Sequence, residues 1–121
     1  MVLVDTSVWV AHFREGNVRL EAALDKGEVL SHPFIIGELA CGNLKNRREI
    51  LALLQTLPRA AAASDEEAMR LIEIRRLVKV GLGYIDVHLL ASALISGVPI
   101  WSLDRTLSRT AERLNVAYQE A

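Results

Sequence analysis

The chain opens with a short apolar run that ends in a carboxylate. Residues 2–4 (Val-Leu-Val) are followed by Asp5. A continuous apolar run of this kind is typical of a parallel strand that is buried on both faces. The hydroxyl residues Thr6 and Ser7 come next, and an apolar helical pattern follows them, so the chain is expected to turn from strand to helix at Asp5. Ligand sites in open α/β sheets lie at the carboxyl ends of strands, which is where Asp5 is expected.

The length and composition limit the class of protein. A chain of 121 residues has room for one hydrophobic core, which predicts a single domain over residues 1–121. The hydrophobic share of 51% fits a parallel sheet covered by helices on both faces, and equally fits an apolar surface kept for a partner or a second copy. Cys41 is the only cysteine, which excludes an internal disulfide and a multi-cysteine zinc site. The sequence shows neither a signal peptide nor a membrane-spanning apolar run, so we expect a cytoplasmic protein with no membrane contact.

Apolar periodicity, together with glycines and prolines, predicts alternating strands and helices along the rest of the chain. Further strands are expected at residues 28–33, 60–63, 98–103 and 116–118. Helices are expected through Trp9 and Phe13, at residues 18–24, 34–40, 50–57, 84–95 and 105–114, and after the capping box that starts at Ser64. This last helix is expected to turn the following side chains toward the core: Met69, Leu71, Ile72, Ile74 and Leu77. The order predicts an α/β fold with a central, mostly parallel sheet of four to five short strands flanked by helices.

Three more acids stand where such a sheet would bring them to Asp5. Glu38 lies in the apolar run after Pro33, Asp86 lies in the first turn of a helix that is apolar nearly all round, and Asp104 ends a strand. Helix capping accounts for Asp5 or Asp104 taken singly. Glu38 taken alone is most simply a solvated helix residue, but capping explains neither Glu38 nor Asp86 within an apolar run.

A cation is the simplest reason for four carboxylates to share a site, because they otherwise repel one another. Oxygen ligands of this kind suit Mg²⁺ or Mn²⁺ rather than zinc. Such ions activate water and stabilise charge on a phosphoryl group, so the site would serve phosphodiester hydrolysis. The net charge of −1 argues neither for nor against nucleic acid binding. If these four acids are set aside, basic residues outnumber acidic ones over the rest of the chain. The histidines show no ligand spacing and are assigned no chemistry: His12, His32 and His88.

Taken together, four motifs in this order resemble the PIN-domain ribonucleases, and among them the VapC-type toxins of toxin–antitoxin pairs. The motifs cover essentially the whole chain and read Val-Leu-Val-Asp5-Thr6-Ser7, Ile36-Gly37-Glu38-Leu39, Gly83-Tyr84-Ile85-Asp86 and Trp101-Ser102-Leu103-Asp104-Arg105. The resemblance implies a three-layer PIN-like fold and an endoribonuclease that uses Mg²⁺ or Mn²⁺ to cut RNA. It also implies a homodimer and a small antitoxin whose C-terminal segment covers the acidic site.

The resemblance also implies roles for particular residues. Asp5 and Asp86 would bind the metal, Asp104 would complete or orient its ligands, and Glu38 would bind a second ion or position the attacking water. Three hydroxyl residues would donate hydrogen bonds to the ligating carboxylates, and local turn and capping bonds are an equal alternative for them: Thr6, Ser7 and Ser102. Candidates for phosphate contact are Arg14, Arg105 and the patch of Lys45, Arg47 and Arg48.

Other classes of function fit the sequence less well. A haloacid-dehalogenase-like phosphatase needs a second Asp two residues after the first, and Ser7 stands at that position. A receiver domain needs adjacent acids near its first strand and a late lysine, and neither is evident. The remaining alternatives are a PIN-like module that binds RNA or protein without cutting, and a metal-dependent phosphohydrolase.

Overall fold

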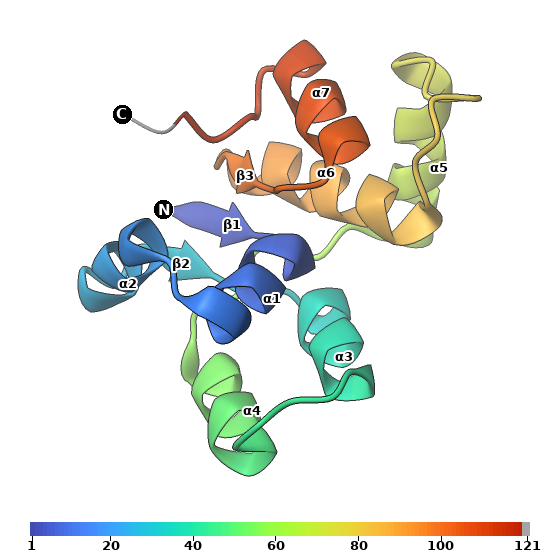
Figure 1. Ribbon diagram of the computed structural model, residues 1–121. Coiled ribbons are helices and arrows are strands. Elements are labelled where there is room, and N and C mark those ends of the chain that lie inside the picture. Colours follow the sequence, from blue (N-terminus) through green and yellow to red (C-terminus); the bar gives the residue numbers. More distant parts are fainter. Residues whose placement is uncertain (120–121) are drawn as a thin grey trace.

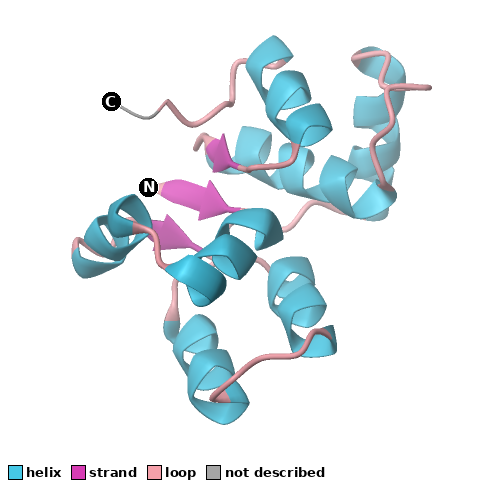
Figure 2. Ribbon diagram, viewed as in Figure 1, coloured by secondary structure: helices cyan, strands magenta, loops and turns pink. Residues whose placement is uncertain are grey.

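The computed structural model describes residues 1–119, which form an α/β fold around a small parallel sheet (Figures 1 and 2). The last two residues of the predicted domain, 120 and 121, lie outside the described residues. Within residues 1–119 the strands are β1 (Val2–Val4), β2 (Val29–Leu30) and β3 (Ile100–Trp101), in the order β2-β1-β3. Both pairs are parallel, and Leu3 of β1 lies opposite Leu30 on one side and Ile100 on the other.

Helices lie on both sides of these strands. In the view of Figure 1, α1, α3 and α4 lie below the sheet, α2 lies to the left of β2, and α5 to α7 lie above the sheet. α1 packs on α3 and α3 on α4, whereas α5 packs on α6, and α6 and α7 both contact β3. No helix within residues 1–119 is long and apolar enough to cross a membrane. The helices are α1 (Thr6–Glu15), α2 (Val18–Asp25), α3 (Pro33–Cys41), α4 (Arg47–Thr56), α5 (Asp65–Ile74), α6 (Tyr84–Ser96) and α7 (Arg105–Arg113).

A helix begins close behind the carboxyl end of each strand. Asp5 is the N-cap of α1, His32 is the N-cap of α3 and Asp104 is the N-cap of α7. Pro33 occupies the first turn of α3, where its missing amide costs nothing. Since the amino end of a helix carries partial positive charge, this edge of the sheet is a favourable place for carboxylates.

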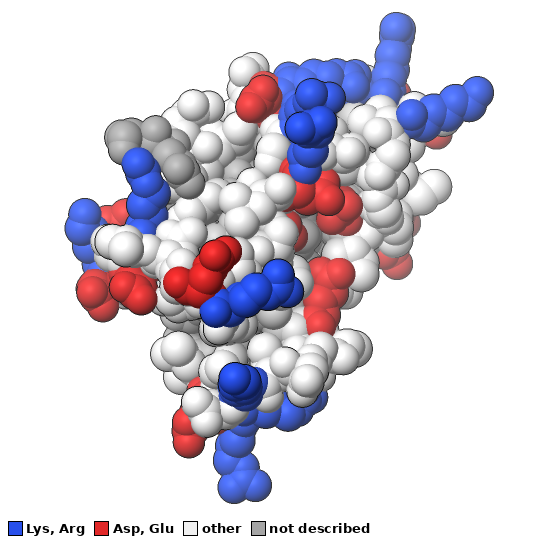
Figure 3. Space-filling view, viewed as in Figure 1, with Lys and Arg blue, Asp and Glu red and all other residues white. Residues whose placement is uncertain are grey.

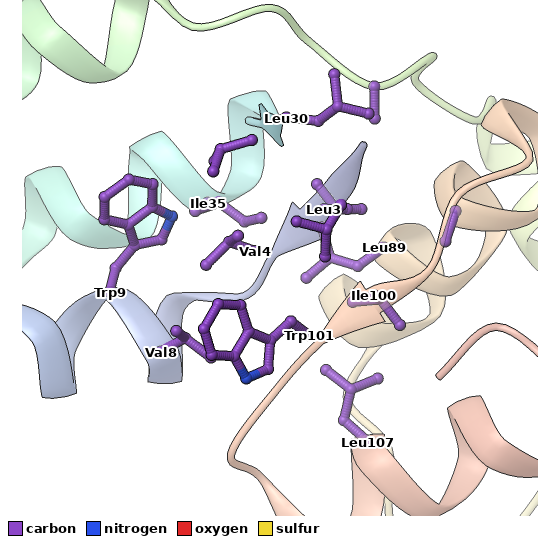
Figure 4. Close-up of a cluster of buried hydrophobic side chains, with 14 of the residues drawn as sticks. Leu3, Val4, Val8, Trp9, Leu30, Ile35, Leu89, Ile100, Trp101 and Leu107 are labelled. Carbon is purple, nitrogen blue, oxygen red and sulfur yellow. The ribbon is translucent and has the colours of Figure 1, made fainter. Parts of the chain in front are cut away.

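The core surrounds the short apolar run with which the chain begins. Leu3 and Val4 are fully buried, and Figure 4 shows them amid side chains from α1, α3, α6 and β3. α6 is buried without interruption from Val87 to Ala93. The apolar run therefore forms a buried strand, as predicted, and the structure places this strand at the centre of the sheet. The expected buried helix covers it.

One of the predicted strands is reduced to a single bridge, and a second bridge lies just before another predicted strand. Ala117 bridges to Ile100 beside β3, and Arg59 bridges to Ser31 just beyond β2. The prediction of a strand at residues 60–63 was wrong, because those residues belong to no strand. The described sheet thus has three strands and a bridge at each side, rather than four to five full strands.

The segment around residues 60–63 is hydrogen-bonded to α6. Ser96 Oγ accepts from the amide of Ala61 at 2.9 Å, and Ser92 Oγ accepts from the amide of Ala63 at 3.4 Å. Asp65, at the start of α5, accepts at Oδ1 from Tyr84 Oη and pairs with His88 Nε2, both at 3.0 Å. We call the four side chains of α6 that make these contacts the polar stripe of α6; they recur every fourth residue and are Tyr84, His88, Ser92 and Ser96.

The helix after the capping box is shorter and less buried than predicted. Ser64 and Glu67 form the expected capping box. α5 ends at Ile74, however, and Leu77 is buried only after the helix has ended. The prediction that Met69 and Ile74 face the core was wrong, since they are 54% and 66% exposed. α5 packs on α6 and buries Ala68, which leaves apolar side chains on its other side in solvent.

Candidate metal-binding site

The four predicted acids lie within electrostatic range of one another at the carboxyl edge of the sheet. Burial is the main cause that raises the pKa of Asp86, and the charge of Asp5 is the next. The charges of Asp104 and Glu38 raise this pKa further, while a hydrogen bond from the Gly83 backbone opposes the rise. Figure 3 shows acidic side chains gathered where α1 and α3 face α6 and α7, with basic side chains on either side. The structure therefore gathers the carboxylates that the sequence analysis placed together.

Asp5 is the most buried of the four acids, at 5% exposure. Its Oδ2 accepts hydrogen bonds from Ser7 Oγ at 2.7 Å and from Ser102 Oγ at 2.9 Å. The capping contact from the Ser7 amide to the same oxygen is longer, at 3.4 Å. Ser102 Oγ also accepts from the amide of Asp104 at 3.0 Å, so one hydroxyl joins two of the acids.

Glu38 and Asp104 are exposed, and each is held by one hydrogen bond. Thr6 Oγ1 donates to Glu38 Oε1 at 2.9 Å, which joins the first turn of α1 to α3. Asp104 Oδ1 accepts from the Leu107 amide at 2.9 Å and so caps α7. The capping interpretation of Asp104 is therefore correct, and it coexists with a position beside the other acids.

These bonds leave one oxygen free on each of three acids. Within residues 1–119, Oδ1 of Asp5, Oε2 of Glu38 and Oδ2 of Asp104 accept no hydrogen bond. As they are arranged, no three carboxylate, imidazole or thiol groups among the described residues stand close enough to share one ion. A metal would therefore have to draw the carboxylates together against their mutual repulsion. The all-oxygen donor set and the free oxygens fit Mg²⁺ or Mn²⁺.

The basic candidates are placed unequally. Arg14 and Lys45 line a groove of about 700 Å³ that also includes Thr6 and Glu38. Arg105 is exposed at the start of α7, directly after Asp104. Arg47, in contrast, donates to the carbonyls of Ala40 and Gly42 near the end of α3, so its guanidinium is engaged within the protein.

Two aromatic residues at this edge were not singled out from the sequence. Phe34 lies in the first turn of α3, one helical turn before Glu38, and Tyr84 opens α6 two residues before Asp86. Both rings are exposed. The only sequence signal for them is their spacing from the two helical acids.

A family model described as PIN domain matches residues 2–113. The chain belongs to the PIN domain family. Among its relatives is Ribonuclease VapC32 of Mycobacterium tuberculosis, in strains CDC 1551 / Oshkosh and ATCC 25618 / H37Rv. Each copy is 40% identical over 121 residues, which span 99% of this chain and 98% of the relative. The resemblance to PIN-domain proteins of the VapC type is thereby confirmed.

A solved structure shows the same fold at lower sequence similarity. The crystal structure of PAE2754 from Pyrobaculum aerophilum superimposes with a TM-score of 0.61 and 18% identity, covering 93% of this chain and 85% of that one. This likeness confirms the predicted PIN-like α/β fold.

Proposed function

We propose that this chain is a metal-dependent endoribonuclease that hydrolyses RNA phosphodiester bonds at the carboxyl edge of its sheet. The observation that carries the proposal is the convergence of four acids there, three of which keep an oxygen that accepts no hydrogen bond within residues 1–119. A relative called a ribonuclease, similar over nearly the whole chain, supports RNA as the substrate.

Asp5, Glu38, Asp86 and Asp104 are the residues that would hold one or two Mg²⁺ or Mn²⁺ ions. A bound ion of this kind supplies an activated water and stabilises charge on the phosphoryl group. The raised pKa of Asp86 supports the assignment. Burial and neighbouring negative charges disfavour the ionised carboxylate, and a nearby cation would offset both effects.

The other polar residues orient these acids and receive the substrate. Ser7 and Ser102 fix the plane of the Asp5 carboxylate, and Thr6 fixes Glu38, as outer hydrogen-bond partners of metal ligands do. Arg14 and Lys45 contact phosphates along the groove that they line. Arg105 contacts a phosphate on the side of α7.

The proposal includes a regulatory partner and a second copy of the chain. We assign the protein as the toxin of a toxin–antitoxin pair in the cytoplasm, neutralised by a small antitoxin that covers the acids. A homodimer is supported by apolar side chains left in solvent on α5 and α6, where Ile74 and Ile95 border a groove of about 370 Å³. A short reading frame directly upstream that encodes a small DNA-binding protein would support the pairing.

The test is RNA cleavage by the purified protein with and without divalent metal. Cleavage is expected with Mg²⁺ or Mn²⁺ and is expected to stop with EDTA or in Asp5→Asn, which keeps a hydrogen-bond acceptor but loses the charge. Asp25→Asn, an exposed acid at the end of α2, is the matched control and should cut as the native protein does. Metal-independent cleavage, or full activity of Asp5→Asn, would overturn the mechanism. RNA binding without cleavage would favour the non-catalytic module, and hydrolysis of phosphomonoesters alone would favour a phosphohydrolase.

A further inference from the structure

The aromatic side chains of this protein are few, and two of them are left in solvent. The sequence has two Trp, two Tyr and two Phe. Both tryptophans are buried, at 1% and 3% exposure. Phe13 and Tyr118 pack against the core. Phe34 and Tyr84, in contrast, are 39% and 44% exposed, and we call this pair the aromatic rim.

The two rings of the aromatic rim share one support, the side chain of His88. Tyr84 and Phe34 both pack on the imidazole of His88, with ring centroids 4.7 Å and 5.1 Å away. His88 is itself buried at 3% exposure, so the rings rest on a fixed support. The hydroxyl of Tyr84 donates to Asp65 Oδ1 at 3.0 Å, which fixes the direction of the tyrosine ring. Rings that are already ordered lose little conformational entropy when a ligand covers them.

The aromatic rim adjoins the acids of the candidate site. Phe34 and Glu38 lie four residues apart on α3 and therefore share a face of that helix. Tyr84 and Asp86 both lie in the first turn of α6. Residues two apart on a helix point in different directions, so Phe34 is the ring that shares a helix face with an acid. Tyr84 is joined to Phe34 through their common contact with His88. A strand of RNA whose phosphodiester reaches Glu38 would carry a neighbouring nucleotide toward these rings.

The charge around the aromatic rim selects which part of a nucleotide can bind there. The Asp65 side chain that anchors Tyr84 is 84% exposed, and its carboxylate repels phosphate. The basic side chains that attract phosphate, those of Arg14 and Lys45, line the groove that includes Glu38, and neither Phe34 nor Tyr84 lines that groove. An uncharged, planar group is thus favoured at the aromatic rim, and a nucleobase has both properties.

We propose that the aromatic rim of Phe34 and Tyr84 stacks one nucleobase of a single-stranded RNA whose phosphodiester lies at the acids. This inference rests on the proposed ribonuclease function and names a specificity-determining contact for it. Stacking of this kind tolerates any base but requires it to be unpaired, so the rim selects single-stranded over duplex RNA.

The first experiment measures binding of a fluorescently labelled single-stranded RNA in EDTA, where no cleavage occurs. Tyr84→Leu and Phe34→Leu are each expected to weaken binding by about tenfold, the loss of one stacked base. Tyr84→Phe keeps the ring and is expected to lose at most about threefold, through its lost anchor to Asp65. Val18→Ala, an apolar residue that is 81% exposed at the start of α2, is the control and should bind as the native protein does. With Mg²⁺ present, the leucine variants should raise KM and leave kcat within about twofold.

A second experiment assigns the stacked base. RNAs that carry one abasic residue at successive positions are compared with native and Tyr84→Leu proteins. One abasic position should weaken native binding by about tenfold and should have no further effect on Tyr84→Leu, because both changes remove the same contact. Additive losses at every position would overturn the proposal.

The outcomes separate this inference from the function on which it rests. If the native protein cuts RNA and both leucine variants bind RNA normally, the aromatic rim has no role in RNA binding and only this inference falls. The same holds if the leucine variants lose binding of a protein partner alone. If the native protein neither binds nor cuts RNA, the proposed function falls as well. Circular dichroism melting of each variant confirms that lost binding does not reflect unfolding.

Discussion

The hydroxyl of Ser102 donates to Oδ2 of Asp5 at 2.9 Å, a contact between residues 97 positions apart in sequence. It joins the carboxyl ends of β3 and β1. Together with the bond from Ser7, it directs one carboxylate oxygen into the protein and leaves the other available. The orientation of the most buried acid therefore depends on two serines.

Removal of the Ser102 hydroxyl should lower the affinity for metal strongly and the free energy of unfolding only slightly. Ser102→Ala is expected to lower Mn²⁺ affinity by about 10- to 100-fold, the usual effect of losing an outer partner of a ligand. Its cost in the free energy of unfolding is expected to be about 1 kcal/mol. Calorimetric titration with Mn²⁺ and urea denaturation measure the two effects. Ser108→Ala is the matched control, because its hydroxyl bonds to the Ser102 carbonyl but to no carboxylate. Equal Mn²⁺ affinity in native protein and Ser102→Ala would contradict the prediction.

Two substitutions of Asp104 separate its capping role from its charge. Asp104→Asn should keep the cap on α7, since Asn and Asp cap equally well, and the metal-free protein should be as stable as the native one or more so. Asp104→Ala should lose about 1 kcal/mol of stability. Both variants should bind Mn²⁺ more weakly. The measurements are thermal melting in EDTA and Mn²⁺ titration. A clear drop in the metal-free melting temperature of Asp104→Asn would show that its charge serves the cap alone.

The stability of the metal-free protein should depend on pH through Asp86. Burial, and next the charge of Asp5, raises the pKa of this carboxyl above its usual value of 3.8. The folded protein therefore favours the neutral form, and stability falls as the pH rises from that value through the folded pKa. Asp86→Asn should be more stable than native protein at pH 7 in EDTA, and the difference should vanish near pH 3. Urea denaturation at both pH values tests this. Mn²⁺ should reverse the order at pH 7, and a less stable Asp86→Asn in EDTA would refute the argument.

His32 should make the fold sensitive to acid. Burial first, and then the charges of His88 and Arg59, lower its pKa from 6.5 to about 4. The unfolded chain takes up a proton in this range and the folded protein does not, so stability is complete above about pH 6.5 and is lost as the pH falls through 4. The full loss is on the order of 3 kcal/mol. His32→Gln should flatten the pH profile of the free energy of unfolding, whereas His12→Gln should leave it steep. A steep profile in His32→Gln would assign the acid sensitivity to another group.

The positions of the acids were predictable because they follow from local patterns. An apolar run that stops at an acid and is followed by hydroxyls and a helical pattern marks a strand end, as at Asp5. In parallel strands all such ends lie at one edge. Asp86 and Glu38 were identified as site residues because an acid within an apolar helical run is unusual and helix capping does not explain it.

The failed predictions concern contacts between distant segments. The alanines at 60–63 read as a strand because they stand between a proline and a capping box, but the amides of Ala61 and Ala63 bond to serines about thirty residues later on α6. Met69 and Ile74 share the helical spacing of core residues, and the pattern does not reveal that α5 packs mainly on α6. The aromatic rim likewise depends on three segments that meet around His88.

The hydrogen bonds that three of the carboxylates already make also affect how the proposed metal site would coordinate an ion. Because one oxygen of Asp5, Glu38 and Asp104 is already bonded within the protein, each of these acids favours monodentate ligation. A near-octahedral ion held in this way retains positions for exchangeable waters, as Mg²⁺ prefers. A larger ion such as Ca²⁺, which draws on bidentate carboxylates for its higher coordination number, would find too few oxygens here. In the proposed metal site, the hydroxyls of Thr6, Ser7 and Ser102 would therefore favour Mg²⁺ or Mn²⁺ over a larger ion, although none of them needs to contact it.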